Sequence, residues 1–276
     1  MSGIPNLNGA SKIYAVFGDP IEQVQTPRLI NPIFSKFGRN IYAVPFHVTS
    51  ESLKKTWEAF CSISNLAGIG PTVPHKVEAA KLCDSLTTAA KAVGAANSIQ
   101  RSPDGKMHGA LFDGLGFVQG LKSNRSRLEG ASVLLIGGGG AGRAIAYALI
   151  AENIASLSVI DKNSDAASFT INMVNTLRGR SIAKVAEPRI SGHTILINAT
   201  PIGLKSADAF PLSLDDLDSS VLVADIASLD RETELLKIAK SKNCVTSDGA
   251  DMLKAQIALI AGFAAGMEAG QVIGQL

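Results

Sequence analysis

The stretch Ala131-Ser-Val-Leu-Leu-Ile-Gly-Gly-Gly-Gly-Ala-Gly142 decides the fold class of this chain. Its first six residues are apolar apart from one serine, and the segment has the length of a buried strand. Four consecutive glycines follow, and an alanine-rich helical pattern then covers Arg143 to Ala151. The stretch therefore predicts a strand, a tight turn and a helix in direct succession, which is the opening unit of a parallel α/β fold.

The glycines of this turn have the spacing G-x-G-x-x-G, which Gly137, Gly139 and Gly142 satisfy. At this spacing the first glycine makes the turn, the second lets backbone approach a pyrophosphate, and the third lets helix and strand pack closely. Gly140 and Ala141 lie beside the helix N-terminus, whose free N–H groups suit phosphates. A glycine-rich turn without a ligand is the alternative. The strand–turn–helix context favours a dinucleotide site formed by these five residues.

An acidic residue follows the next predicted strand, Ser156–Ile160. Asp161 lies 161 − 142 = 19 residues after the last glycine of the turn, close to the roughly 20 expected for a carboxylate that binds the ribose. It would bind the ribose hydroxyls of NAD and repel the 2′-phosphate of NADP, while the adjoining Lys162 would soften that preference. We therefore expect NAD(P) as cofactor, with NAD favoured by Asp161. A much higher catalytic efficiency with NADP(H) would contradict this preference.

The rest of the chain alternates strand-like and helix-like segments, which predicts α/β layers. Its 276 residues suffice for about two domains. We expect a smaller α/β substrate domain over 1–113, completed by C-terminal helices over 249–276, and a Rossmann-type dinucleotide-binding domain over 114–248, with a cleft between them. The predicted strands are 12–17, 40–47, 67–73, 95–100, 107–111, 131–136, 156–160, 194–198, 221–225 and 244–246, with a hairpin between the fourth and fifth. Thr26 is the expected N-cap of a helix that begins at Pro27.

Composition argues against several classes of protein. The 26 basic and 24 acidic residues give a net charge of +2, too small to indicate nucleic acid or a membrane surface as partner. The charge-free stretch Ala255–Met267 is shorter than the roughly 20 residues that a membrane span needs. The N-terminus has no signal-peptide pattern, and Cys61, Cys83 and Cys244 have no metal-ligand spacing. We expect a cytoplasmic monomer or homodimer with reduced cysteines, no metal and a small-molecule substrate.

Two ionisable residues outside the glycine turn are candidates for proton transfer. Lys76 stands where a predicted strand gives way to a helix, and the helix dipole disfavours a cation there, which suits proton release. An exposed structural lysine is the alternative. Asp113 precedes a helical pattern, so an N-cap carboxylate is its alternative role. Together they offer the ammonium–carboxylate pair needed when an alcohol loses a proton as hydride leaves, although spacing alone does not bring them together.

Six segments, in order and over nearly the whole chain, resemble the shikimate/quinate dehydrogenase family. They are Tyr14-Ala-Val-Phe-Gly-Asp-Pro-Ile21, Thr72-Val-Pro-His-Lys76, Val93-Gly-Ala-Ala-Asn97, Gly109-Ala-Leu-Phe-Asp113-Gly114, Asn198-Ala-Thr-Pro-Ile-Gly203 and Asp248-Gly-Ala-Asp-Met-Leu-Lys-Ala-Gln256. Each motif is weak alone, but their shared order makes a specific joint signal. The resemblance implies a cofactor domain and a substrate domain that together oxidise a cyclic polyol acid.

The resemblance also implies roles for individual residues. Lys76 and Asp113 would be the catalytic pair. The segment 198–203 would border the nicotinamide, which adds Asn198, Thr200 and Pro201 to the cofactor site. The substrate would be held by Thr26, Thr72, Asn97 and Gln256. Without the resemblance, the last three would be turn, cap or partly exposed helix residues.

Four positions depart from the family pattern, all on the substrate side. Where the family has two hydroxyl residues before a proline to hold the substrate carboxylate, this chain has Val24 and Thr26. Leu111 and Phe112 stand where the family has Asn-Thr, and Ser228 stands in place of a tyrosine. An apolar side chain cannot replace a hydrogen bond to a buried carboxylate or hydroxyl. The departures therefore predict a changed substrate selectivity.

The chain is accordingly expected to be an NAD(P)-dependent dehydrogenase that transfers hydride between nicotinamide and a secondary alcohol of a shikimate-like cyclic polyol acid. One alternative is a nucleotide-binding regulatory protein with a degenerate substrate pocket, which Val24 and Leu111 favour and Lys76 and Asp113 oppose. Another is a dehydrogenase of an amino-substituted or neutral cyclitol. An NAD(P)H absorbance assay against such alcohols separates the three.

Overall fold

The computed structural model describes residues 7–123, 127–203, 210–227 and 232–273, and the chain forms two compact units. Unit 1 consists of Met1–Phe112 and Ile257–Leu276, and unit 2 consists of Asp113–Gln256. The chain thus returns to unit 1 after unit 2 is complete. This return falls inside one helix, α9 (Gly249–Ala264), rather than at residue 249, where the sequence predicted it. The assignment of the substrate to unit 1 stays a prediction.

Unit 1 is built on a six-stranded sheet. Its elements are β1 (Lys12–Gly18), α1 (Thr26–Lys36), β2 (Ile41–His47), α2 (Leu53–Cys61), β3 (Leu66–Pro71), α3 (Lys76–Leu82), β4 (Ser85–Leu86), α4 (Thr88–Val93), β5 (Ser98–Arg101) and β6 (Met107–Ala110). The strand order is β2-β1-β3-β5-β6-β4. β5 runs antiparallel to β3 and β6, and the other pairings are parallel. The carboxyl ends of β1, β3 and β6 and the amino end of β5 therefore share one edge of the sheet.

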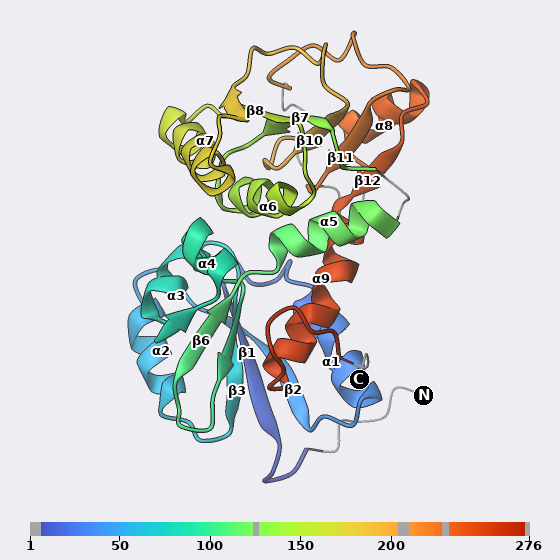
Figure 1. The fold of residues 1–276 in the computed structure, drawn as a ribbon. Helices are drawn as coiled ribbons and strands as arrows, with labels where there is room; N and C mark the ends of the chain where they lie inside the picture. Colours follow the sequence, from blue (N-terminus) through green and yellow to red (C-terminus); the bar gives the residue numbers. More distant parts are fainter. Residues whose placement is uncertain (1–6, 124–126, 204–209, 228–231, 274–276) are drawn as a thin grey trace. The chain divides into compact units, whose positions relative to one another are not determined.

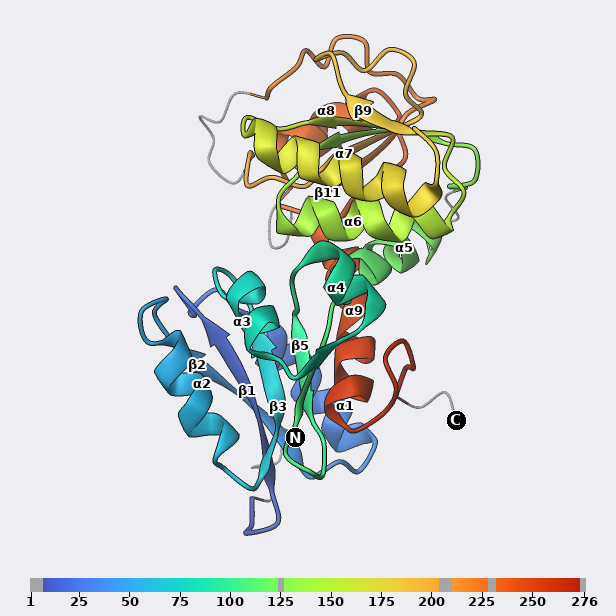
Figure 2. The ribbon, with the colours of Figure 1, turned by 60° about the vertical axis from the view of Figure 1, so that its left-hand side comes forward.

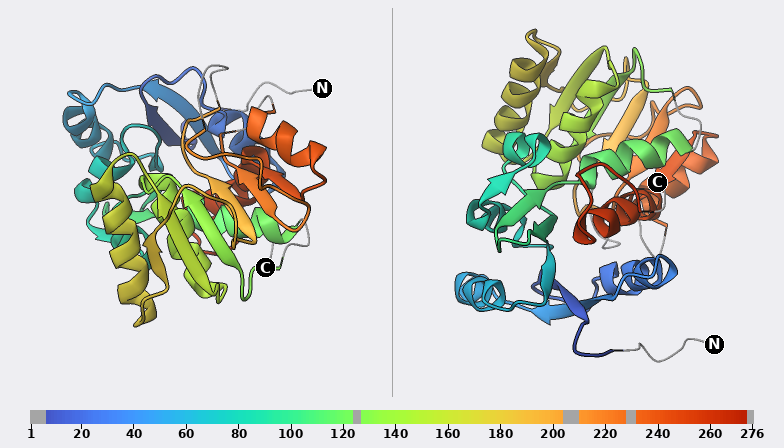
Figure 3. Two further views of the ribbon diagram at one scale, coloured as in Figure 1. Left: turned by 90° about the horizontal axis from the view of Figure 1, so that it is seen from above. Right: turned by 60° about the horizontal axis from the view of Figure 1, so that its bottom comes forward.

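Helices cover both faces of this sheet, because side chains along β1 alternate between two apolar clusters. Tyr14 belongs to a cluster with α1 and the end of α9, whereas Ala15 belongs to a cluster with α2 and α3. Figure 1 shows this arrangement, and Figure 3 (right) shows α1 and α2 on opposite sides of β1 and β2. The Gln100 side chain on β5 also donates a hydrogen bond to the carbonyl oxygen of Phe263 at 2.9 Å. The end of α9 is thereby fixed to unit 1.

Unit 2 is built on a second six-stranded sheet, whose strand pairings within the described residues are all parallel. Its elements are α5 (Asp113–Ser123), β7 (Ser132–Ile136), α6 (Gly140–Ala151), β8 (Ser156–Ile160), α7 (Ser164–Arg178), β9 (Ala183–Val185), β10 (Ile195–Asn198), β11 (Leu222–Asp225), α8 (Glu234–Ser241), β12 (Thr246–Asp248) and the first half of α9. The strand order β12-β11-β10-β7-β8-β9 is the doubly wound order of Rossmann-type folds. The predicted fold class is confirmed.

The two faces of the second sheet are covered by different helices, as Figure 2 shows. Val133 and Leu135 of β7 pack with α5, α6 and α7, whereas Leu134 and Ile136 pack with α8. The apolar residues of β7 are therefore buried on both faces of the sheet, as expected for a central parallel strand. α5 approaches α6 closely, since a Cβ at Gly114 would lie 1.9 Å from a carbonyl oxygen of α6.

The structure corrects several predicted element ends. α6 begins at Gly140 rather than Arg143, because Gly139 already caps the helix in an extended conformation. Thr26 is the first residue of α1, with Gln25 at the cap position, so the predicted N-cap was wrong. The last strand is Thr246–Asp248 instead of 244–246. The sequence missed β4 and β9, whose two and three residues are too few to show an alternating pattern.

Within the described ranges, no helix has both the length and the apolar character to cross a bilayer. The same residues contain no group of three or more His, Cys, Asp or Glu side chains that could hold a metal ion. Cys61, Cys83 and Cys244 are free thiols. Burial raises the pKa of each, that of Cys83 to about 12, so these thiols stay protonated at neutral pH.

Candidate functional site

The turn after β7 requires glycine at three positions, Gly137, Gly138 and Gly142. Gly137 has a φ of +101°, a backbone conformation that side chains rarely adopt. A Cβ at Gly138 would lie 2.8 Å from the carbonyl oxygen of Ala166 on α7. A Cβ at Gly142 would lie 1.8 Å from the carbonyl oxygen of Gly137, so any side chain there would separate helix from strand. The turn follows the carboxyl end of β7. At this point the strand order of the sheet reverses, between β7 and β10. Open α/β sheets bind their ligands at this kind of position.

The next residues leave room beside the turn. Among the described residues, no atom outside the local backbone would lie within 4 Å of a Cβ at Gly139 or Gly140. Gly139 caps α6, and Gly140 and Ala141 begin its first turn, where backbone N–H groups have no partner inside the helix. Open space and free N–H groups together suit a pyrophosphate. The residues of the turn therefore fit a bound dinucleotide.

Backbone groups hold the Asp161 carboxylate beside this turn. Its Oδ2 accepts the N–H of Gly138 at 2.7 Å, and its Oδ1 accepts the N–H of Asn163 at 2.8 Å. Each carboxylate oxygen can accept a second hydrogen bond, so these contacts orient the group without saturating it. Lys162 is exposed in the same loop. The carboxylate is thus fixed next to the glycines, as a ribose-binding residue would need to be.

The Asn198 side chain organises the loop after β10. Its Oδ1 accepts hydrogen bonds from the backbone N–H of Thr200 at 3.1 Å and from the Thr200 hydroxyl at 2.6 Å. Its Nδ2 donates to the carbonyl oxygen of Ile202 at 3.0 Å. A Cβ at Gly137 would lie only 2.7 Å from the Thr200 methyl carbon. The structure therefore brings Asn198 and Thr200 beside the glycine turn, with Pro201 exposed in the same loop.

Two residues that the sequence analysis did not single out complete this network. Asp225, only 1% exposed at the end of β11, accepts hydrogen bonds from Asn198 Nδ2 at 2.9 Å and Thr233 Oγ1 at 2.6 Å. Thr233 also caps α8. Burial raises the pKa of Asp225, against the opposing effect of its hydrogen bonds. The sequence did offer a signal for Asp225, because this charged residue ends the apolar run Val221-Leu-Val-Ala-Asp225. A carboxylate at the end of a buried strand requires hydrogen-bond donors nearby.

In unit 1, three candidate residues lie along the sheet edge defined by the carboxyl ends of β1, β3 and β6. Thr72 follows β3, and a Cβ at Gly18, the last residue of β1, would lie 2.6 Å from its methyl carbon. Lys76 begins α3, and its carbonyl oxygen accepts the N–H of Ala96 at 2.9 Å. Asn97 comes next, directly before β5. The fold thus gathers Thr72, Lys76 and Asn97 at one edge although 25 positions separate the first from the last.

Two side chains at this edge are bonded to backbone. The Oδ1 of buried Asn97 accepts the N–H of Phe112 at 2.9 Å, which links the start of β5 to the segment after β6. His75 is 1% exposed, and its Nε2 lies 2.6 Å from the carbonyl oxygen of Val48. That nitrogen must carry a proton, because a carbonyl only accepts hydrogen bonds. His75 therefore fixes the start of α3, directly before Lys76.

The residues that depart from the family pattern pack largely into the core of unit 1. Leu111 and Phe112 are buried, and the Phe112 ring meets a phenylalanine of α9 edge to face at 5.6 Å between ring centres. Val24 is half-buried and packs against the same cluster. Thr26, the hydroxyl residue that remains, is half-buried at the start of α1. Ser228 lies outside the described residues.

Asp113 and Gln256 stand at the two ends of the unit 2 segment. Asp113 is 3% exposed and is the first residue of α5. Gln256 lies on α9 against α5, since a Cβ at Gly116 would lie 2.5 Å from that of Gln256. Within the part of the chain that the structure describes, the buried Oε1 of Gln256 has no hydrogen-bond partner, so it suits a donor from a ligand. Lys76 belongs to the other unit, and its approach to Asp113 stays a prediction.

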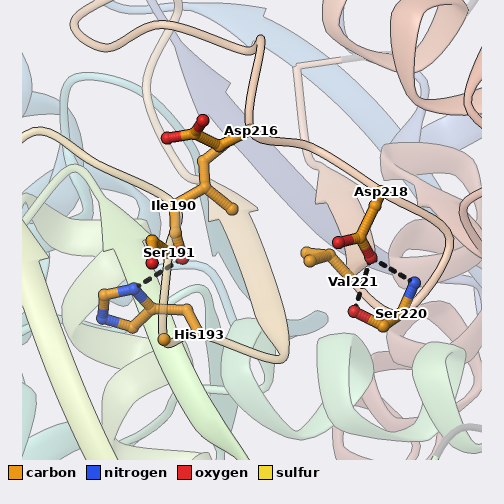
Figure 4. Close-up of a pocket in the computed structure, with 8 residues that line it drawn as sticks. Ile190, Ser191, His193, Asp216, Asp218, Ser220 and Val221 are labelled. Carbon is orange, nitrogen blue, oxygen red and sulfur yellow. Dashed lines mark hydrogen bonds between the residues drawn. The ribbon is translucent and has the colours of Figure 1, made fainter.

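A cavity of about 330 Å³ lies elsewhere in unit 2. Its lining includes His193, Asp216, Asp218 and Ser220, which precede β10 and β11 (Figure 4). Because these strands are parallel to β7, the cavity lies at the amino edge of the sheet, opposite the glycine turn. Its polar groups bond to the surrounding loops: Asp218 accepts the N–H and hydroxyl of Ser220, and His193 Nδ1 donates to a carbonyl oxygen at 3.1 Å. This cavity is not the dinucleotide site.

Known proteins share this sequence pattern and this architecture. A family model described as the shikimate dehydrogenase substrate binding domain matches residues 16–99, all within unit 1. A shikimate dehydrogenase (NADP(+)) from Bacillus licheniformis is 34% identical over 250 residues, which cover 90% of this chain and 89% of the relative. The solved shikimate 5-dehydrogenase of Listeria monocytogenes, in complex with shikimate and NAD, is 26% identical with a TM-score of 0.87 and covers 98% of this chain and 97% of its own. A ligand-free 5-ketofructose reductase of a Gluconobacter species is 26% identical with a TM-score of 0.83 and covers 95% of each chain.

Proposed function

The chain belongs to the shikimate dehydrogenase family, and from this premise we propose that it is an NAD(P)-dependent dehydrogenase of a shikimate-like cyclic polyol acid. The observation that carries the proposal is the glycine turn of unit 2, which combines free backbone N–H groups with open space at the reversal of strand order. The similarity to the Bacillus licheniformis relative covers nine tenths of the chain and therefore extends over both units.

The reaction separates a hydride from a proton. A bound nicotinamide cofactor would supply the hydride acceptor for oxidation of the alcohol and the hydride donor for the reverse reaction. We assign the hydroxyl proton to Lys76, whose amine takes it as the alcohol is oxidised and gives it back as the ketone is reduced. Asp113 would orient this amine and balance its charge in the protonated state. The position of Lys76 on the edge that also carries Thr72 and Asn97 supports the assignment.

We assign the remaining substrate contacts to four polar side chains. Ring hydroxyls would bond to Thr72, Asn97 and Gln256, and the unpartnered Oε1 of Gln256 supports its part in this set. Thr26 would hold the substrate carboxylate with one hydroxyl where the family has two. Val24 packs against the apolar cluster, which supports weaker binding of the substrate carboxylate than two hydroxyl residues would give.

For the cofactor we propose a preference for NAD over NADP. The two backbone hydrogen bonds that orient Asp161 beside the turn support it, because a fixed carboxylate bonds ribose hydroxyls and repels a 2′-phosphate. The preference is measured by the ratio of kcat/KM for the two nucleotides with the same alcohol. A higher value for NADP(H) would overturn it.

A second candidate function is the reduction of a polyol ketone that has no carboxylate. Val24, which removes one carboxylate-binding hydroxyl, favours this function, and so does the likeness to the 5-ketofructose reductase. The catalytic assignment would stay the same, since a neutral secondary alcohol also loses a hydride and a proton. The two candidates differ only in what the segment around Thr26 must bind.

The test is an NAD(P)H absorbance assay with shikimate, quinate, aminoshikimate and a carboxylate-free cyclitol, each with both nucleotides. Turnover that needs the carboxylate supports the first function, and turnover of the carboxylate-free alcohol alone supports the second. If the protein binds nucleotide but turns over none of these alcohols, both dehydrogenase proposals fail and a regulatory nucleotide-binding protein replaces them.

We further propose that the enzyme works in the cytoplasm as a monomer or homodimer. The three cysteines are free thiols, which supports a reducing compartment. Fractionation of cells tests the compartment, and sedimentation tests the oligomeric state. A membrane or secreted fraction, or a tetramer, would contradict the proposal.

A further inference from the structure

Arg143 places a cation on the first turn of α6, directly after the glycine turn. The N-terminus of a helix carries a positive partial charge, so a guanidinium is unfavourable there unless other groups compensate. Its Nε donates a hydrogen bond to the carbonyl oxygen of Gly138 at 3.1 Å, and its guanidinium carbon lies 4.1 Å from the centre of the Phe169 ring. The structure therefore holds a planar cation in a fixed orientation at the anion-binding end of this helix.

The aromatic partner is itself fixed to the same point of the turn. Phe169 lies on α7 with 44% of its surface exposed, which is unusual for a phenylalanine. The next residue, Thr170, is fully buried, and its hydroxyl donates to the same Gly138 carbonyl at 3.0 Å. The Gly138 carbonyl thus ties α6 and α7 together. Half-buried Arg143 and exposed Phe169 form a stack, and the hydrogen bonds to the Gly138 carbonyl oxygen keep it in place.

Asp161 is the opposing charge in this neighbourhood. Burial lowers the pKa of Arg143, and the Asp161 carboxylate acts in the opposite direction, so the two charges lie within electrostatic reach. In the described structure, Asp161 bonds to two backbone N–H groups, while Arg143 bonds through Nε, and no ion pair joins the two residues. The terminal guanidinium nitrogens can therefore still donate to a ligand.

We propose that Arg143, stacked on Phe169, is a specificity-determining residue of the adenosine site that opposes Asp161. In this pair Asp161 selects a 2′-hydroxyl and Arg143 favours a 2′-phosphate, so the discrimination between NAD and NADP is the difference between the two effects. The inference rests on the proposed dinucleotide function and adds a second residue to its cofactor selectivity. A guanidinium suits this role because its planar donors bind phosphate oxygens in pairs.

Lys162 is the rival source of positive charge, since it adjoins Asp161 in the sequence. It is exposed, and no described aromatic ring or hydrogen bond fixes its amine. An exposed, flexible lysine contributes little to a charge interaction, because solvent screens it and ordering it costs entropy. The effect of Arg143 on a 2′-phosphate is therefore expected to exceed that of Lys162.

The experiment measures the affinity for ADP-ribose and for 2′-phospho-ADP-ribose by isothermal titration calorimetry. Both probes lack nicotinamide, so the readout is independent of turnover. The proteins are the wild type, Asp161→Asn, Arg143→Gln, the Asp161→Asn/Arg143→Gln double variant and Lys162→Gln. We expect Asp161→Asn to favour the 2′-phosphorylated probe by about tenfold or more, as hydrogen bonds to charged groups predict. Arg143→Gln should disfavour it by a similar factor and remove most of the gain in the double variant.

Lys162→Gln should change the ratio of the two affinities by less than about fivefold. Phe169→Leu keeps an apolar side chain on α7 but removes the ring face, and it should reproduce part of the Arg143→Gln effect. Thermal melting of each variant identifies any that do not fold. The inference is overturned if the double variant keeps the gain of Asp161→Asn, or if Lys162→Gln matches Arg143→Gln. A wild type that binds neither probe would instead overturn the proposed dinucleotide function.

Discussion

The two sheets hold their candidate ligand-binding groups in different ways. In unit 2 the glycine turn 137–142 offers backbone N–H groups, and three of its positions leave no room for a side chain. In unit 1 the groups are the side chains of Thr72, Lys76 and Asn97, which separate segments carry to one edge. We therefore expect substitutions that add atoms to damage the turn 137–142, called here the cofactor turn. We expect substitutions that remove a functional group to damage the edge with Thr72, Lys76 and Asn97, called here the substrate edge. A fold divided in this way can change its substrate while it keeps its cofactor.

The largest expected effect comes from removing the amine at the substrate edge. Lys76→Ala should lower kcat by about 10²–10⁴-fold, the range for loss of a positioned general acid–base group. Nucleotide affinity, measured by calorimetry, should stay within about twofold, because the variant leaves the glycine turn intact. Lys81→Ala is the matched control, since Lys81 lies on the same helix in an exposed pair with Glu78 at 2.7 Å. Full activity of Lys76→Ala would remove this residue from the mechanism.

The next effect tests the intolerance of the cofactor turn to added atoms. Gly142→Ala should lower the free energy of unfolding in urea by about 3 kcal/mol, because its Cβ would lie 1.8 Å from the Gly137 carbonyl oxygen. Gly140→Ala adds the same methyl group to open space on the first turn of α6. It should leave stability within about 1 kcal/mol of the wild type, since alanine favours helices, yet weaken nucleotide binding. Equal stability losses in both variants would contradict the packing role of Gly142.

A smaller effect tests whether the substrate edge responds to a restored functional group. Val24→Thr adds a hydroxyl with little change in volume at a half-buried position. It should lower KM for a carboxylate-bearing alcohol by about tenfold, which corresponds to the free energy of one hydrogen bond to a charged group. KM for a carboxylate-free cyclitol should stay unchanged. Val24→Ala controls for the loss of packing. A similar response to both classes of alcohol would remove Val24 from carboxylate selectivity.

The smallest effect concerns the buried carboxylate of Asp225, which accepts a hydrogen bond from Asn198 at the start of the loop after β10. The pKa of Asp225 is raised in the folded protein, so just above the ordinary value of 3.8 the folded state holds more protons than the unfolded state. The free energy of unfolding contributed by this group therefore falls as pH rises through that window. Relative to Asp225→Asn, the wild type should gain stability as the pH of a urea titration is lowered toward the ordinary aspartate value. The opposite slope would show that the hydrogen bonds from Thr233 and Asn198 outweigh burial.

The same contrast explains how much of the molecule could be predicted from its sequence. The turn at 137–142 was predictable because strand, glycines and helix are contiguous in the sequence. The pairing of Asp225 with Asn198 and Thr233 was not, because it depends on the register between β10 and β11 and on where α8 begins. Thr72 and Asn97 were predicted from family resemblance alone, since nothing in the spacing places Asn97 near Lys76. Thr26 was misplaced by one position because a Thr-Pro pair can cap a helix or begin it.

The single helix α9, shared by both units, has a consequence for the order in which the protein is made. Ile257–Ala264 covers one face of the first sheet, so residues 1–112 leave the ribosome without part of their own core. Unit 2 has 256 − 113 + 1 = 144 residues, which take about 7 to 29 s to synthesise at roughly 5–20 residues per second. During this interval the apolar face that carries Tyr14 and Phe34 lacks its final cover. The nascent chain is therefore a natural client for chaperones, and truncation before residue 257 should leave an aggregation-prone protein even though the whole of unit 2 is present.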